Sequence, residues 1–212
     1  MLATQKMTPR LTKTAYLRYL KCPQEFWLEH HQPLLFGAEP VTLEYQHLRQ
    51  QGYEVESYVK KLTQFQPDGT KSVDFQFDFH TAEFFAKSDV VVTDKDTGEV
   101  NIYEIKGAAS VKEEHYDDVA FQKMVAEKSG ANVGRCYVIT MNGEYVRRGD
   151  IDVERLFTIT DVTDKVAERM PLTEQQAVAA RAYLESDPVA SLIDYCADNK
   201  LACRFIKLHF PG

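Results

Sequence analysis

The pattern of apolar and polar residues along the chain of 212 residues indicates a strand-rich centre with helical segments on both sides. Apolar and polar residues alternate in "SVDFQFDFHTAEFFAKSDVVVT", residues 72–93, which predicts two β-strands. The loop "DKDTGE", in which Gly98 suits a positive φ, predicts a hairpin that returns in the strand "VNIYEIKG". The nearly all-apolar "GRCYVITMN" predicts a strand in the middle of a covered sheet, and "RLFTITDVT" predicts a further short strand.

The N-terminal segment, residues 11–32, carries the start signals of two short helices. Thr12 or Thr14 supplies an N-cap for the first helix, and Pro23 suits the first turn of the second. The prolines at both ends of residues 33–40 predict a loop.

Residues 41–62 predict one long helix, because apolar residues recur at helical spacing. The expected apolar stripe consists of Leu48, Val55, Val59 and Leu62. A glycine inside a helix costs about 1 kcal/mol relative to alanine. We therefore expect Gly52 to allow close packing against another backbone.

Helical spacing returns after the hairpin. "KEEHYDDVAFQKMVAEKSG" predicts a helix that ends at Gly130, with Val119, Phe121, Met124 and Val125 facing inward. Three further helices are expected, at about 163–170, 173–186 and 188–199. Thr173 and Gln176 would form a capping box at the start of the second of these. A hairpin joined through a helix to a buried strand predicts an α/β fold, with a mixed central β-sheet flanked by helices on both faces.

Composition narrows the class of protein. Apolar residues make up 44% of the chain and charged residues 27%, which is ordinary for a soluble globular protein. No apolar run approaches the ~20 residues that span a bilayer, and the N-terminus lacks the apolar segment of a signal peptide. Four cysteines in a chain of this length favour a reducing cytoplasm over a disulfide scaffold. A net charge of −7 argues against a broadly basic surface, but it is compatible with a local basic groove or an acidic metal site.

Candidate chemistry lies at the end of the strand "VNIYEIKG". Side chains alternate along a strand, so Glu104 and Lys106 continue the apolar face that Val100 and Ile102 begin. The hairpin loop is centred at residues 96–97, which places Asp89 almost opposite Glu104. Two carboxylates at that position destabilise the sheet unless a cation lies between them. The alternative is an exposed cross-strand ion pair.

Magnesium, or manganese in its place, suits such a position because it prefers oxygen ligands. Asp89 and Glu104 would bind the ion, and the backbone carbonyl of Ile105 could add a third ligand. The ammonium of Lys106 would favour deprotonation of a metal-bound water and stabilise the attacking hydroxide. This constellation suits hydrolysis of a phosphodiester.

These residues resemble the PD-(D/E)xK nuclease superfamily, specifically its RecB-like branch, which includes the CRISPR-adaptation exonucleases. Asp89 matches the first acidic position, and Glu104, Ile105 and Lys106 match the (D/E)xK element. An uncharacterised bacterial family of that branch is more similar still. Its opening motif resembles "LTKTAYLRYLKCPQEFWLEHH", and its later motifs resemble "HYDDVAFQ", "NGEYVRRGDIDVERLF" and "DVTDKV".

The resemblance implies a single domain over residues 1–212 with a restriction-endonuclease-like core at about 41–160. Additional helices would lie at 11–32 and 163–200. Gln122 would be the polar helix residue that contacts the site or the DNA. The branch usually has a tyrosine four positions later, where this chain has Ala126.

The resemblance also implies one more ligand from the long helix, just after a glycine. Glu54 is the first choice and Glu56 the second, and a solvated helix face is the alternative for both. Some members of the branch hold an iron–sulfur cluster through one N-terminal and three C-terminal cysteines. Here Cys22 is at the first position, but only Cys196 and Cys203 are near the C-terminus, which favours ordinary buried thiols over a cluster.

Three functions follow as hypotheses. The first is a deoxyribonuclease that depends on Mg²⁺ or Mn²⁺ and acts from a DNA end. The second is a nuclease-like module that binds nucleic acid or acts as a scaffold without turnover. The third is a nuclease directed at RNA.

Overall fold

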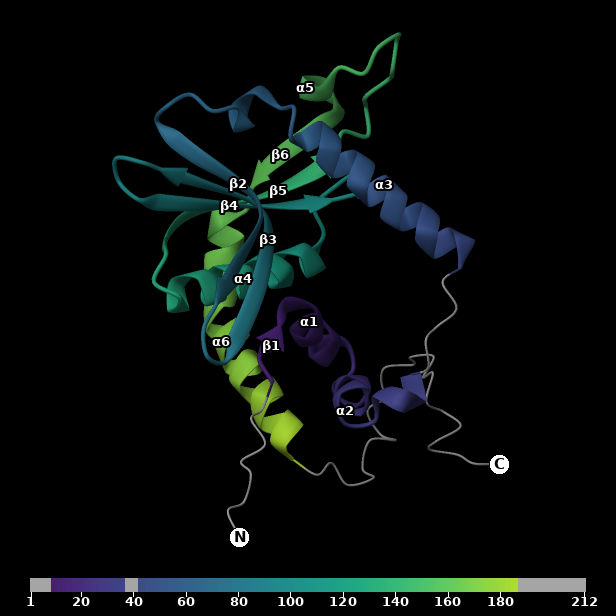
Figure 1. Cartoon of the computed structure of the whole chain (residues 1–212), viewed down its shortest axis with the longest axis vertical. Helices are drawn as coiled ribbons and strands as arrows, with labels where there is room; N and C mark the ends of the chain where they lie inside the picture. Colours follow the sequence, from purple (N-terminus) through teal and green to yellow (C-terminus); the bar gives the residue numbers. More distant parts are fainter. Residues whose placement is uncertain (1–8, 37–41, 187–212) are drawn as a thin grey trace.

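The computed structural model describes residues 9–36 and 42–186, and it has a central mixed β-sheet with helices on both faces (Figure 1). Its six strands are β1 (Leu11–Thr12), β2 (Lys71–His80), β3 (Phe84–Asp94), β4 (Glu99–Lys106), β5 (Asn132–Met141) and β6 (Phe157–Asp161). The order across the sheet is β1-β3-β4-β5-β6, with β2 paired to β3. The predicted fold class is confirmed: this is a restriction-endonuclease-like α/β core.

The helices form two layers around this sheet. They are α1 (Lys13–Lys21), α2 (Pro23–His31), α3 (Leu43–Val59), α4 (Glu113–Lys128), α5 (Val153–Leu156) and α6 (Thr163–Glu185), with the 3₁₀ helices η1 (Pro33–Phe36) and η2 (Thr63–Phe65). Helices α1, α4 and α6 pack on one face of the sheet. The end of α3, η2 and α5 cover part of the other face through Val59, Phe65 and Leu156. Within the described ranges, no helix has the length and apolar content needed to cross a bilayer.

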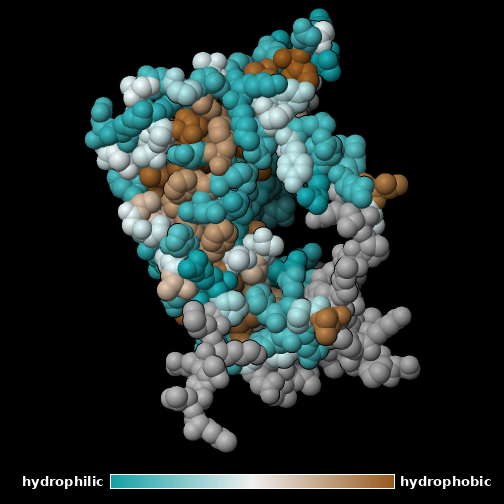
Figure 2. Space-filling model, in the orientation of Figure 1, coloured by the Kyte–Doolittle hydropathy of each residue, from teal (hydrophilic) through white to brown (hydrophobic). Residues whose placement is uncertain are grey.

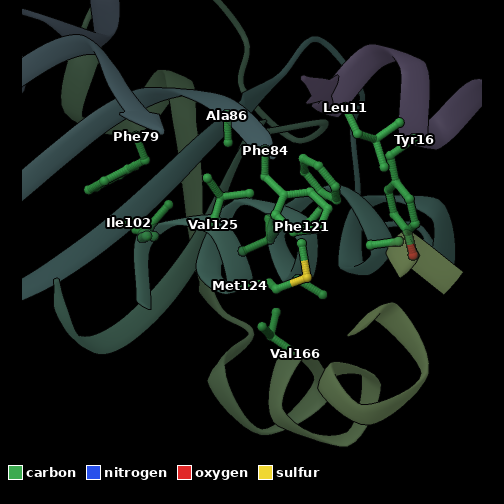
Figure 3. Packing of buried hydrophobic residues seen from close by; sticks show 14 of the residues in the cluster. Leu11, Tyr16, Phe79, Phe84, Ala86, Ile102, Phe121, Met124, Val125 and Val166 are labelled. Carbon is green, nitrogen blue, oxygen red and sulfur yellow. The ribbon is translucent and has the colours of Figure 1, made fainter. Parts of the chain in front are cut away.

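The larger core lies between the sheet and α4. Phe121 is fully buried there and stacks on Tyr16 of α1, with 4.7 Å between the ring centroids (Figure 3). Ile102 of β4 and Met124 of α4 belong to the same cluster, as does Val166 of α6. Because truncating a buried aromatic residue costs about 3–5 kcal/mol, Phe121 is a principal anchor between α1 and α4.

Strands β1 and β4 share one edge of β3, and this arrangement positions the site. Parallel strand β1 pairs at Phe84 and Phe85, whereas antiparallel strand β4 pairs from Thr93 back to Val90. Strands β1 and β4 therefore run toward each other along the same edge of β3. Residues that follow β1 and residues at the end of β4 meet beside Ala86–Asp89 of β3.

The hairpin of β2 and β3 changes face in the same region. Phe75 packs on the α3 side of the sheet and Phe79 on the α4 side, although residues four apart share a face in a regular strand. Likewise Ala86 packs on the α4 side and Val90 on the other. The rotation occurs at Gln76, which has φ +56°. Asp89 lies opposite Gln76 in the hairpin, and this half-turn of the two strands brings Asp89 to the end of β4.

Most predicted elements are confirmed. Thr12 caps α1 by accepting a hydrogen bond from the Ala15 amide, and Pro23 begins α2. Gly98 in the hairpin and Gly130 after α4 have positive φ angles of 70° and 97°. The four residues predicted to face inward from α4 are all buried.

The predicted break in the C-terminal helices is wrong. Helix α6 runs unbroken from Thr163 to Glu185 with Pro171 inside it, so Thr173 and Gln176 do not form a capping box at a helix start. The helix continues because buried residues on both sides of the proline, including Val166 and Ala177, pack into the same core. The third helix predicted there, 188–199, lies outside the described residues.

The predictions for α3 are partly wrong. Val59 and Leu62 are buried, but Leu48 is 59% exposed because most of the helix extends away from the sheet (Figure 1). The surface of α3 is largely hydrophilic in Figure 2. A Cβ at Gly52 would meet no atom within 4 Å, so this glycine does not serve close packing. The predicted loop at 33–40 begins with the 3₁₀ turn η1.

Candidate active site

The hairpin register brings Asp89 to the end of β4, as the sequence predicted. The backbone ladder between β3 and β4 reaches the pair Val90–Tyr103. Beyond that pair, the Ile105 amide donates a hydrogen bond of 2.8 Å to Asp89 Oδ2. The Asp89 carboxylate thus accepts the hydrogen bond that a backbone carbonyl would accept in a continued ladder. It lies beside the end of β4, which carries Glu104.

Glu104 and Lys106 face helix α4, on the apolar side of β4 that Ile102 begins. Glu104 is 3% exposed. The Lys106 ammonium donates a hydrogen bond of 2.7 Å to Glu104 Oε1 and also bonds Asp118 Oδ2. This ion pair is therefore part of a buried cluster and is not the exposed cross-strand pair considered as the alternative.

A second lysine enters the cluster from the other end of the β3 edge. Lys13, the first residue of α1, has its Nζ 3.1 Å from both Glu104 oxygens and 3.2 Å from Asp118 Oδ1. Two ammonium groups thus alternate with two carboxylates. The side chains of Lys13 and Lys106 keep 19% and 23% of their surface exposed, whereas Glu104 and Asp118 keep 4% and 5%. The carboxylates are therefore the more deeply buried members of the cluster.

Helix α4 forms the inner wall of the cluster with residues at helical spacing. Gln122 Nε2 donates to Glu104 Oε2 at 2.7 Å and to Asp118 Oδ1 at 3.0 Å. Gln122 is fully buried, and its Oε1 has no hydrogen-bond partner in the described residues. His115, two turns before Gln122, is also buried, and its Nδ1 accepts a hydrogen bond from the Lys112 amide. Gln122 therefore fixes the orientation of both carboxylates.

The electrostatics of the cluster follow from burial and from an excess of acids. Burial, followed by Asp118 and Asp89, raises the pKa of Glu104 to about 7. Burial alone would also raise the pKa of Asp118, but Lys13 and Lys106 outweigh it and lower that pKa to about 2. Three carboxylates share two ammonium groups, so a proton or another cation is favoured at Glu104.

Burial acts against the charge of the lysines, yet both stay protonated. It lowers the pKa of Lys106, but Glu104 and Asp118 outweigh it and leave this pKa above the usual value. The same balance holds for Lys13, whose pKa is also raised. The raised pKa values favour the ammonium form of both side chains.

The two glutamates expected from α3 differ in position. Gln76 Nε2 donates to Glu56 Oε2 at 3.2 Å and to Asp89 Oδ1 at 3.3 Å, which links Glu56 to the site through one amide. Glu54 is exposed and accepts a hydrogen bond from Gln50 of its own helix. The structure brings Glu56 toward the site and leaves Glu54 on a solvated helix face.

The donor set suits a hard divalent ion bound together with substrate. Asp89, Glu104 and the Ile105 carbonyl are oxygen donors, which Mg²⁺ and Mn²⁺ prefer. In the part of the chain that the structure describes, no three His, Cys, Asp or Glu side chains are grouped to hold a metal ion. Magnesium commonly uses one or two carboxylates, with water and phosphate completing its shell, so the residues present fit such an ion.

The described cysteines have local roles. Cys22 is buried, and its Sγ accepts the Glu25 amide at the start of α2. Cys136 is buried in β5, and burial raises the pKa of its thiol to about 12. Cys196 and Cys203 lie outside the described residues.

Two members of the cluster were missed from the sequence. Lys13 is in the threonine–lysine–threonine start of the N-terminal segment, and Asp118 is four residues before Gln122. The spacing of Asp118 and Gln122 puts both on one face of α4 and could have indicated Asp118. Nothing local connects Lys13 to Glu104, because their contact depends on the pairing of β1 with β3.

Comparisons with known proteins agree on the fold alone. No protein-family model and no curated protein matches the sequence. The chain is similar to the crystal structure of SSO0001, with a TM-score of 0.50 and 13% identity over 95% of this chain and 88% of that chain. It is also similar to an alkaline exonuclease (LHK-Exo) from Laribacter hongkongensis, with a TM-score of 0.49 and 14% identity over 92% of this chain and 94% of that chain. The class defined by fold and site is a mixed α/β core with acids and lysines at the end of a central strand.

Proposed function

We propose that this protein is a metal-dependent nuclease of the RecB-like branch of the PD-(D/E)xK superfamily, which hydrolyses DNA from an end. The supporting observation is the arrangement at the end of β4. There Asp89 accepts the Ile105 amide at 2.8 Å, between the side chains of Glu104 and Lys106. The order of acid, acid and lysine matches the motif, and the fold presents all three at one strand end.

Asp89, Glu104 and the Ile105 carbonyl would hold Mg²⁺ or Mn²⁺, and Glu56 is a further candidate ligand through its link to Gln76. When bound, such an ion lowers the pKa of water and offsets charge on the phosphate. Gln122 keeps the Glu104 carboxylate oriented, since it donates to Oε2 at 2.7 Å.

Lys106 acts as a cation in this proposal. Its raised pKa keeps the ammonium charged at neutral pH. A half-buried ammonium beside the reacting phosphate stabilises an attacking hydroxide and the negative charge that develops during the reaction. DNA contacts elsewhere would be made to the phosphate backbone. Because the net charge of the chain is −7, they would come from local groups of basic residues and not from a broadly basic surface.

The test uses end-labelled linear DNA, a closed circular DNA and an RNA of matched sequence. Wild-type protein is expected to degrade linear DNA in Mg²⁺ or Mn²⁺ and to lose this activity in EDTA. Circular DNA should resist, which separates action at an end from internal cleavage. Faster degradation of the RNA would favour the RNA-directed alternative.

Lys106→Met is expected to lower the cleavage rate by about 10²–10³-fold, the usual effect of removing one charge-stabilising donor. Lys165→Met is the matched control, because Lys165 is exposed on α6 and pairs with Glu168. Circular dichroism establishes that both variants are folded. Equal rates for folded Lys106→Met and wild type would contradict the proposal.

A nuclease-like binding module without turnover is the second candidate, and one observation favours it. Both oxygens of Glu104 already accept hydrogen bonds, from Lys13, Lys106 and Gln122. A metal ion would have to compete with those donors. DNA binding without cleavage in either metal would support this candidate.

A further inference from the structure

We propose that Lys13 is a second substrate-binding lysine of this site, whose ammonium contacts a phosphate oxygen of the bound DNA. This inference rests on the proposed function and deepens it. It adds to the strand-end motif a residue from the N-terminal segment, 91 positions away from Glu104.

The two ammonium groups form the solvent side of the buried cluster. Lys13 and Lys106 both donate to Oε1 of Glu104, at 3.1 and 2.7 Å, so their ammonium groups are close neighbours. Their side chains are 19% and 23% exposed, whereas those of Glu104 and Asp118 are 4% and 5% exposed. The two lysines are therefore the members of the cluster that are most accessible to an anion in solvent. A phosphodiester offers two non-bridging oxygens to such a pair.

The packing of helix α1 on the core does not account for the positive charge of Lys13. Leu11 and Tyr16 on either side of Lys13 are fully buried, and Tyr16 stacks on Phe121. A buried ion pair contributes little net stability compared with apolar residues of similar size. The packing of α1 therefore does not require an ammonium here. The charge neutralises Glu104 and Asp118 and, in this proposal, also binds the substrate phosphate.

The surrounding backbone favours the same ligand. Lys13 is the first residue of α1, a helix of nine residues, and the N-terminus of a helix carries positive partial charge that favours phosphate. The opposed ends of β1 and β4 hold Lys13 and Lys106 on the same edge of β3. Asp118 bonds both lysines and is the positioning residue of the pair.

The experiment measures binding of a fluorescein-labelled single-stranded oligonucleotide in EDTA, where no cleavage interferes, over a series of KCl concentrations. Lys13→Met is expected to weaken binding about tenfold at low salt. It should also reduce the slope of log affinity against log salt by about 0.7, the value for one lost phosphate contact on a single strand. Lys21→Met, which removes the same charge from the exposed last turn of α1, should stay within about twofold of wild type.

A second pair of variants guards against misfolding. Asp118→Asn with Lys13→Met removes one buried charge of each sign, and it is compared with Asp118→Asn alone. The double variant should again bind more weakly and with a smaller salt slope. Unchanged affinity and slope in the folded double variant, or no binding by wild type, would overturn the inference.

The outcomes separate this inference from the proposed function. Cleavage by wild type in Mg²⁺, with normal binding by Lys13→Met, would leave the nuclease and remove the role of Lys13. A smaller salt slope in Lys13→Met, without cleavage by wild type in Mg²⁺ or Mn²⁺, would leave Lys13 as a phosphate contact of a binding module.

Discussion

The Lys13 ammonium lies 3.1 Å from both oxygens of the Glu104 carboxylate, although the two residues are 91 positions apart. Strand β1 places Lys13 beside β3, and strand β4 brings Glu104 to the same edge from the opposite direction. The buried acid of the motif is thus stabilised by a residue from outside the motif.

This contact predicts strong coupling in a double-mutant cycle. Lys13→Met alone should lower the free energy of unfolding by about 3 kcal/mol, because it leaves a buried carboxylate with one cation fewer. Combined with Glu104→Gln, the loss should be smaller than the sum of the single losses by about 1–3 kcal/mol. Urea unfolding followed by circular dichroism measures each corner of the cycle. Additive losses would mean that the two side chains do not interact in solution.

The φ of +56° at Gln76 predicts a strong dependence on side-chain shape. A β-branched residue is strained in this left-handed region, whereas asparagine tolerates it. Gln76→Val should therefore lower the free energy of unfolding by about 1–2 kcal/mol more than Gln76→Asn. Chemical denaturation of the two variants measures the difference, and equal stability would show that the ribbon has relaxed at this position.

Asp161 predicts a pH dependence of stability. Its Oδ1 accepts the side chain and the amide of Thr163 at 2.6 and 2.9 Å, and the side-chain bond is the main reason that its pKa is lowered. A lowered pKa stabilises the fold above the unfolded value of about 3.9 and ceases to do so as the pH falls through the folded value. Asp161→Ala should therefore cost about 1 kcal/mol at pH 7, the usual net contribution of a side-chain hydrogen bond.

The deficit of Asp161→Ala relative to wild type should shrink as the pH falls below about 4. Thermal unfolding of both proteins between pH 7 and pH 3 tests this. A deficit that is constant across the range would show that the carboxylate charge is not involved.

Substituting alanine for Gly52 or for Gly130 should change stability in opposite directions. Gly52 lies in exposed α3, where an added Cβ would have no atom within 4 Å, so Gly52→Ala should stabilise this helix by about 1 kcal/mol. Gly130 has φ +97°, so Gly130→Ala should destabilise the protein by about 1 kcal/mol. Hydrogen exchange of the α3 amides measures the first change, and urea unfolding measures the second. Unchanged exchange of the α3 amides in Gly52→Ala would contradict the explanation for Gly52. Unchanged free energy of unfolding in Gly130→Ala would contradict the explanation for Gly130.

The hairpin and its acids could be predicted because their geometry is local. The loop around Gly98 sets the register between β3 and β4, and the register sets Asp89 beside the Glu104 strand end. The 3.6-residue spacing of α4 likewise determines that Val119, Phe121, Met124 and Val125 point inward. Gln122 was indicated by the resemblance to the nuclease branch and not by this spacing. In each case, a few covalently linked residues fix which groups can meet.

The sequence by itself determined the strands, the hairpin register and the alternation that carries Glu104 and Lys106 to the buried face, because backbone geometry repeats every few residues. Tertiary structure alone decided that Lys13 joins them, that Glu56 and not Glu54 approaches Asp89, and that α6 passes unbroken through Pro171. These outcomes depend on packing and strand pairing between distant segments. The free energy of such contacts exceeds the local preferences that the sequence reveals, and it is fixed only once the sheet and its helices have assembled.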